Sequence, residues 1–139
     1  MASKIFVDAN CLLDLTLQRA NFHHMEVLVQ LSIAGELRLH TTPGVLHIVS
    51  YYTGKFYGKD VAKQVILALL KDLQIIDCIH ETVITAAASN FADPEDALQY
   101  YTALYHGMDY FISADKQLKK NALSQLPVYS SKDLLAVIA

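Results

Sequence analysis

The sequence has few of the residues that stabilise very small proteins or build phosphate-binding loops. Its 139 residues include two cysteines, five glycines, three prolines and no tryptophan. Cys11 and Cys78 lie in apolar surroundings without C-x-x-C spacing, so they predict reduced core thiols rather than a disulfide framework or structural zinc site. The glycines are scattered and form no phosphate-binding loop, and no nucleophile-elbow motif is present.

Long apolar runs and strong net charge are also absent. No apolar run approaches the roughly 20 residues of a membrane span, and the first residues lack the apolar core of a secretion signal. We therefore expect a cytoplasmic protein that does not enter the membrane. A net charge of −3 does not indicate a nucleic-acid binder. However, if the acids gather in one metal site, the remaining surface is less negative than this total implies.

What the sequence does have is enough apolar material for one core. Apolar residues make up 53% of the chain, and the length fits a single domain over residues 1–139. Strand patterns alternate with helix patterns, which predicts an α/β fold: a twisted parallel sheet of four or five strands with helices on both faces. Strands are expected at 4–7, 37–41, 74–79, 110–113 and 127–129, and helices near 12–17, 23–34, 43–54, 58–73, 80–91, 94–107, 116–121 and 132–138.

Acidic residues stand at the junctions where this sheet would place its ligands. Asp8 ends the first strand, Asp115 follows the fourth, and Asp96 lies in the first turn of a helix, three residues after Asp93. In open parallel sheets the carboxyl ends of the strands form the ligand-binding edge. Hard cations such as Mg²⁺ and Mn²⁺ prefer oxygen ligands, so we expect a metal site. The alternative is that each acid only caps a helix, a role that Asn10 can also fill.

Two segments resemble the signatures of the PIN domain family. The first runs from Val7 through Asp8-Ala9-Asn10 into an apolar helix. In the second, Asp93-Pro94-Glu95-Asp96-Ala97 opens a helix, and the chain then passes through Gly107 to a strand that ends Ser113-Ala114-Asp115. Their order and spacing agree with the family from residue 4 to about 130. The resemblance implies a metal-dependent ribonuclease of the kind that forms the toxin of bacterial and archaeal toxin–antitoxin pairs, with RNA and an antitoxin protein as partners.

The resemblance also assigns roles to individual residues. Asp8, Asp96 and Asp115 match the family's metal-binding acids, which hold Mg²⁺ or Mn²⁺, and Asp93 matches an extra acid of some members. Asn10 and Ser113 match polar residues that support the pocket. A metal held in this way activates water for attack on an RNA phosphodiester.

One position departs from the family pattern. A glutamate usually follows a proline in the helix after the second strand, and here the spacing puts His47 in its place. Three interpretations stay open: His47 binds a softer metal, stands beside a weakened Mg²⁺ or Mn²⁺ site, or marks lost catalysis. The last favours a second function, a PIN-like module that binds RNA or a partner protein without cleaving. A phosphatase-like or DNA-directed hydrolase on the same acids is a third option.

Further candidates surround this proposed site. Asp14 is either a supporting group behind Asp8 or an exposed helix residue. Lys116 and Lys119 follow Asp115 and form either a solvated helix face or phosphate contacts. Aromatic residues accompany Lys55 in an expected turn flanked by glycines, and they fit either a homodimer interface or stacking on unpaired bases; these are Tyr51, Tyr52, Phe56 and Tyr57.

Overall fold

The computed structural model describes residues 2–138 and contains a five-stranded, wholly parallel sheet. The strand order is β3-β2-β1-β4-β5, which puts the first strand at the centre. This confirms the predicted fold class, with five strands rather than four. The strands are β1 (Ser3–Val7), β2 (Leu37–Thr41), β3 (Leu73–Ile75), β4 (Tyr110–Ile112) and β5 (Val128–Tyr129).

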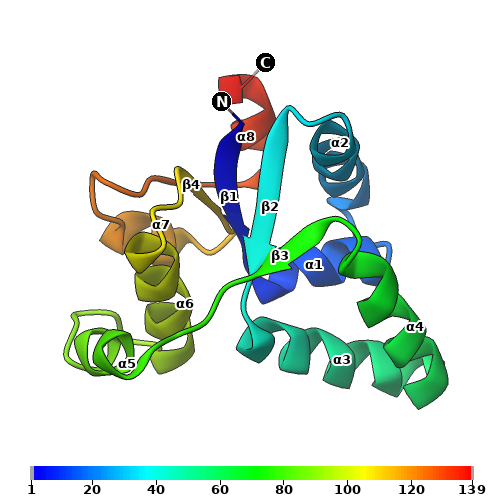
Figure 1. Cartoon of the computed structure of the whole chain (residues 1–139), viewed down its shortest axis with the longest axis horizontal. Coiled ribbons are helices and arrows are strands. Elements are labelled where there is room, and N and C mark those ends of the chain that lie inside the picture. Colours follow the sequence, from blue (N-terminus) through cyan, green and yellow to red (C-terminus); the bar gives the residue numbers. More distant parts are fainter. Residues whose placement is uncertain (1, 139) are drawn as a thin grey trace.

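Helices cover both faces of the sheet (Figure 1). Helices α1 to α4 lie on one side, and α5, α6 and α7 lie on the other. Helix α8 contacts α2 and β5. None of the helices in residues 2–138 is long and apolar enough to cross a membrane. The helices are α1 (Ala9–Thr16), α2 (Phe22–Ile33), α3 (Pro43–Tyr57), α4 (Lys59–Leu69), α5 (His80–Ala87), α6 (Pro94–Tyr105), α7 (Lys116–Asn121) and α8 (Ser131–Ile138).

Local signals set several helix boundaries as predicted. Thr42 caps α3 by accepting a hydrogen bond from the Val45 amide at 3.2 Å, with Pro43 in the first turn. Gly35 and Gly107 follow helices with φ of 81° and 70°, a left-handed conformation that glycine adopts without strain.

The expected boundaries of four elements were wrong. Helix α3 continues past Gly54 because the backbone bond from Gly58 to the Gly54 carbonyl, at 2.8 Å, extends the helical pattern. Helices α4 and α5 end at Leu69 and Ala87, before the predicted 73 and 91. Strand β3 begins at Leu73, and pairing ends with the Ile76 amide on the Thr41 carbonyl at 2.9 Å. The chain then leaves the sheet because β2 has ended.

The centre of the sheet defines a topological switch point. Strand β1 pairs with β2 on one side and with β4 on the other, and the helices after β1 and β4 cover opposite faces. The rings of Phe6 and Phe111 stack at 4.8 Å between centroids and fix this pairing in the core. Because Val7 is paired with Ile112, Asp8 and Ser113 emerge side by side at the carboxyl ends of these strands. Ligands of open α/β sheets bind at such a point.

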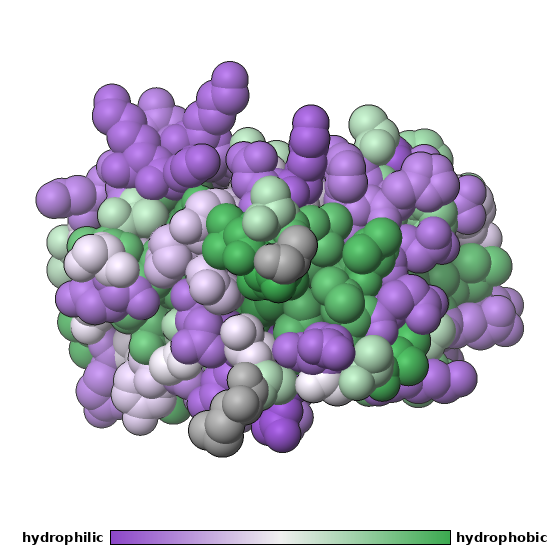
Figure 2. Space-filling model, turned by 90° about the horizontal axis from the view of Figure 1, so that it is seen from above, coloured by the Kyte–Doolittle hydropathy of each residue, from purple (hydrophilic) through white to green (hydrophobic). Residues whose placement is uncertain are grey.

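The opposite edge of the sheet, where β1 begins, has a different character. Figure 2 looks onto this edge and shows hydrophobic residues gathered near the middle of the face, with hydrophilic residues around them. The acids that follow β1 and β4 lie at the other end of the strands.

Candidate metal centre

Asp8 is both the last residue before α1 and a buried acid of the switch point. Its Oδ1 accepts a hydrogen bond from the Cys11 amide at 2.8 Å, so Asp8, rather than Asn10, caps α1. The side chain is only 6% exposed. Burial raises the pKa of Asp8, an effect that the hydrogen bond from Ser113 partly offsets and that the nearby Asp14 charge reinforces.

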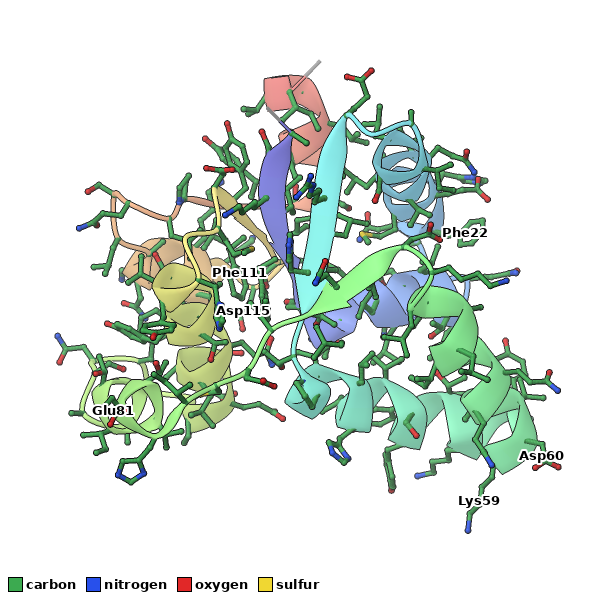
Figure 3. The ribbon with its side chains drawn as sticks, viewed as in Figure 1. Phe22, Lys59, Asp60, Glu81, Phe111 and Asp115 are labelled. Carbon is green, nitrogen blue, oxygen red and sulfur yellow. The ribbon has the colours of Figure 1, made fainter. Side chains whose placement is uncertain are left out.

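Asp115 occupies the equivalent position after β4. Its Oδ1 caps α7 by accepting from the Gln117 amide at 2.8 Å and the Leu118 amide at 3.3 Å. The buried Ser113 hydroxyl accepts from the Asp115 amide at 3.1 Å. Ser113 therefore links the two strand-end acids, since it contacts both Asp8 and the backbone of Asp115. In Figure 3, Asp115 lies between α6 and the strands.

The first turn of α6 contributes two more acids. Asp93 caps the helix by accepting from the Glu95 amide at 2.9 Å. Asp96 lies one turn further on, where burial and then the charges of Asp93, Asp115 and Asp8 raise its pKa to about 6. The charges of three carboxylates, which come from three segments of the chain, therefore act on Asp96.

One cavity of about 580 Å³ brings these residues together. Its acidic wall consists of Asp8, Asp93, Glu95, Asp96 and Asp115, and Asn10 also lines it. Sequence reasoning had grouped all of these except Glu95, which follows from the same helix turn. Across the cavity, α3 presents apolar and aromatic residues at helical spacing instead of an acid: Ile48, Tyr52 and Phe56.

Several predicted residues lie outside this cavity. His47 is exposed and lines a separate pocket with Ser50 and Lys63. Because it is adjacent to Ile48 on a helix with 3.6 residues per turn, it points about 100° away from the acids. Lys116, Lys119 and Lys55 are exposed and are not among the residues of the cavity wall. Instead, Lys119 and Lys55 each lie 5.9 Å from the centroid of a tyrosine ring.

Arg19 is a cavity residue that sequence reasoning missed. Its Nε donates to Asp14 Oδ1 at 2.9 Å, and its Nη2 donates to the Asn10 carbonyl at 2.8 Å. Asp14 is therefore buried rather than exposed, and it holds a cation on the cavity wall; its supporting role stays a prediction. The local signal was weak, because Arg19 follows Gln18, whose positive φ of 52° turns the chain back toward α1.

Gln99 was also missed, although it lies one turn after Asp96 on the same face of α6. It lines the cavity and is only 7% exposed. Its Oε1 is buried without a hydrogen-bond partner among the described residues. The spacing of three residues from a predicted acid was the signal that could have found it.

The chemical type of these carboxylates fits a hard divalent cation. They are oxygen donors, and their mutual repulsion is the electrostatic situation that a cation relieves. Within residues 2–138, no three His, Cys, Asp or Glu side chains already stand close enough to hold one ion. Mg²⁺ suits such an open arrangement because it keeps several waters and takes only one or two carboxylates directly.

The sequence pattern of the PIN domain matches residues 4–117. The chain belongs to the PIN domain family. Members of this family are typically nucleases and generally use divalent metals. No curated protein sequence matches the chain significantly.

Solved structures with the same fold include VapC toxins. VapBC2 from Rickettsia felis, crystallised with a DNA fragment from its promoter, aligns with a TM-score of 0.71 at 14% identity, over 91% of this chain and 98% of that chain. VapC20 from Mycobacterium tuberculosis, a toxin that cleaves the sarcin-ricin loop, aligns with a TM-score of 0.68 at 13% identity, over 87% of this chain and 97% of that chain. PAE2754 from Pyrobaculum aerophilum aligns with a TM-score of 0.69 at 15% identity, over 99% of this chain and 98% of that chain. These likenesses show the fold.

Proposed function

We propose that this PIN domain is a metal-dependent ribonuclease that hydrolyses RNA phosphodiester bonds. The observation that carries the proposal is the convergence of Asp8, Asp96 and Asp115 on one cavity at the switch point. Three separate segments, after β1, after β4 and at the start of α6, each supply a carboxylate. Their oxygen donors suit Mg²⁺ or Mn²⁺.

In this mechanism the chain's residues hold and orient the reacting groups. Asp8, Asp96 and Asp115 would bind the cation, with Asp93 beside them. When bound, the metal supplies an activated water and neutralises charge on the phosphate. Ser113 keeps Asp8 in place through its hydrogen bond, and the Asp14-anchored Arg19 offers its remaining N–H groups to a phosphate of the strand.

We extend the proposal to the biological setting. Residues 1–139 form one cytoplasmic PIN-like domain that serves as the toxin of a toxin–antitoxin pair, with an antitoxin protein as partner and a homodimer as the working assembly. The names of the structural neighbours support this setting. Lys116, Lys119 and Lys55 are proposed as phosphate contacts along the strand outside the cavity, where their exposure allows such contacts.

A second function, binding without cleavage, is favoured by the wall that α3 contributes. That wall holds Ile48, Tyr52 and Phe56 rather than a fourth strong ligand, and His47 faces a different pocket. A module with this wall can bind RNA or a partner protein even if the acids hold a metal weakly.

One comparison separates the two functions. Single-stranded RNA is incubated with Mg²⁺ or Mn²⁺ and either the wild-type protein, Asp96→Asn or the control Asp60→Asn. Asp60 is an exposed acid on α4, far from the site in Figure 3. Cleavage by wild type and Asp60→Asn, lost in Asp96→Asn, supports the ribonuclease. If no variant cuts and calorimetry detects no metal binding, the ribonuclease proposal is wrong and the binding module stands.

A further inference from the structure

Two aromatic side chains form an exposed rim beside the acids. Tyr52 is 44% exposed and Phe56 is 70% exposed, yet both belong to the wall of the acid cavity. What distinguishes them from other exposed apolar side chains is that they line the same cavity as the acids. A substrate bound at the proposed site of hydrolysis would therefore lie against them.

The rim is a built feature of α3. Ile48, Tyr52 and Phe56 follow at intervals of four residues, so they form one stripe of the helix facing the cavity. Tyr51 packs edge-on against the Tyr52 ring, with centroids 5.1 Å apart and planes at 85°. Lys55 lies over the Tyr51 ring at 5.9 Å. Tyr52 is thus braced from one side, while its own contact with the cavity remains open.

We propose that Tyr52 and Phe56 are a base-stacking platform that positions unpaired nucleotides of the RNA substrate at the acids. The inference rests on the proposed ribonuclease function and assigns two side chains that would hold the bases of its substrate. Base–aromatic stacking does not depend on charge, and every base offers a ring face. That matters here because the acidic wall repels the phosphates of the same strand, and Arg19 is the cation on that wall.

The spacing of Tyr52 and Phe56 along α3 favours unpaired bases. Residues four apart on a helix differ by about 6 Å along its axis. Successive stacked bases of a strand are only about 3.4 Å apart. Tyr52 and Phe56 therefore receive bases that have left their own stack, as in loops and single strands. A duplex keeps its base faces covered and gives the rim nothing to stack on.

The first test places a fluorescent reporter at the rim. The chain has no tryptophan, so Tyr52→Trp introduces a single one, and Tyr57→Trp is its matched control. Tyr57 lies on the same helix and is 52% exposed, but it is not part of the cavity wall. Both are made in an Asp8→Asn background to prevent cleavage. A short single-stranded RNA of mixed sequence should quench Tyr52→Trp and leave Tyr57→Trp unchanged. An abasic ribose-phosphate oligomer should quench neither.

The second test uses truncation and keeps the inference falsifiable if the tryptophan variant folds poorly. Tyr52→Ala and Phe56→Ala should each weaken RNA binding on the order of tenfold, by the same factor at low and high salt, whereas Tyr57→Ala should not. Size-exclusion chromatography of the same variants follows the oligomeric state. If Tyr52→Ala and Phe56→Ala instead dissociate a dimer at unchanged RNA affinity, the rim is an interface between copies and the inference fails.

The two proposals fail in different ways. Equal quenching at both positions, or no quenching at either, overturns the stacking platform even when the wild-type protein cleaves RNA. Quenching confined to Tyr52→Trp supports the platform even when the wild-type protein cleaves nothing, and in that case only the ribonuclease proposal is lost.

Discussion

Asp14 holds Arg19 against the acid cavity through a hydrogen-bonded ion pair of 2.9 Å between Nε and Oδ1. The pair crosses from the buried face of α1 to the loop that follows it. Nη2 donates to the Asn10 carbonyl, so two hydrogen bonds set the orientation of the guanidinium. Within the described residues the Nη1 amino group makes no hydrogen bond, and it can therefore donate to a ligand. The site thus combines a cation held by two hydrogen bonds with several acids.

This relationship predicts the salt dependence of RNA binding. Arg19→Gln should weaken binding at low salt, because it removes one phosphate contact. It should also reduce the slope of log K against log salt concentration by about 0.7, the value for one contact to a single strand. The measurement is fluorescence anisotropy over a KCl series. Arg38→Gln is the control, since Arg38 is exposed near the other end of the strands. Equal slopes for both variants contradict the assignment.

The raised pKa of Asp96 predicts how stability changes with pH without divalent metal. In the folded protein this pKa is about 6 instead of 3.8. Between these pH values the folded state binds more protons than the unfolded state, so the free energy of unfolding falls as pH rises through the window. Asp96 should therefore raise the melting temperature on acidification from pH 7 to pH 5, against an opposite contribution from His40, whose pKa is lowered by burial. Asp96→Asn should flatten this rise, and Asp60→Asn should preserve it. An unchanged profile in Asp96→Asn contradicts the prediction.

Metal addition should stabilise the folded protein. Mn²⁺ or Mg²⁺ at about a hundred times its Kd contributes about 2.7 kcal/mol, which raises the melting temperature by several degrees. The shift should shrink below pH 6, since protons compete for the carboxylates. Scanning calorimetry with and without metal measures it. Asp8→Asn should lose most of the shift and Asp60→Asn should retain it. A full shift in Asp8→Asn would place the metal elsewhere.

The unpartnered Gln99 amide predicts a stabilising substitution. A buried polar atom without a partner costs about 1–3 kcal/mol. Gln99→Met keeps the length of the side chain and removes the orphaned oxygen, so we expect the free energy of unfolding to rise by about 1 kcal/mol in urea titration. Gln74→Met, at an exposed glutamine on β3, should be close to neutral. A loss of stability in Gln99→Met would mean that the amide makes a bond in the folded protein.

The strand-end acids were predictable because strand ends and helix starts are local features. Apolar β-formers lead into Asp8 and Asp115, and parallel topology brings such ends to one edge. The side of α3 that faces the cavity was not predictable in the same way. His47 and Ile48 are neighbours in sequence, yet a helix turns about 100° between them, and only packing against α1 and α4 decides which one faces the acids. The place of Arg19 at the cavity was not predictable because it depends on one positive φ, at Gln18, which changes the direction of the chain.

Asp8, Asp93 and Asp115 each line the acid cavity and also cap a helix, so their presence alone does not indicate a metal site. Each anchors the start of a helix through Oδ1, and removing such a cap costs about 1 kcal/mol. Even without the proposed cleavage, all three would therefore still contribute to folding. Asp96 caps no helix and carries an electrostatic penalty when no cation is present. Under the proposed function, Asp96 is thus the acid of the site whose replacement costs folding least.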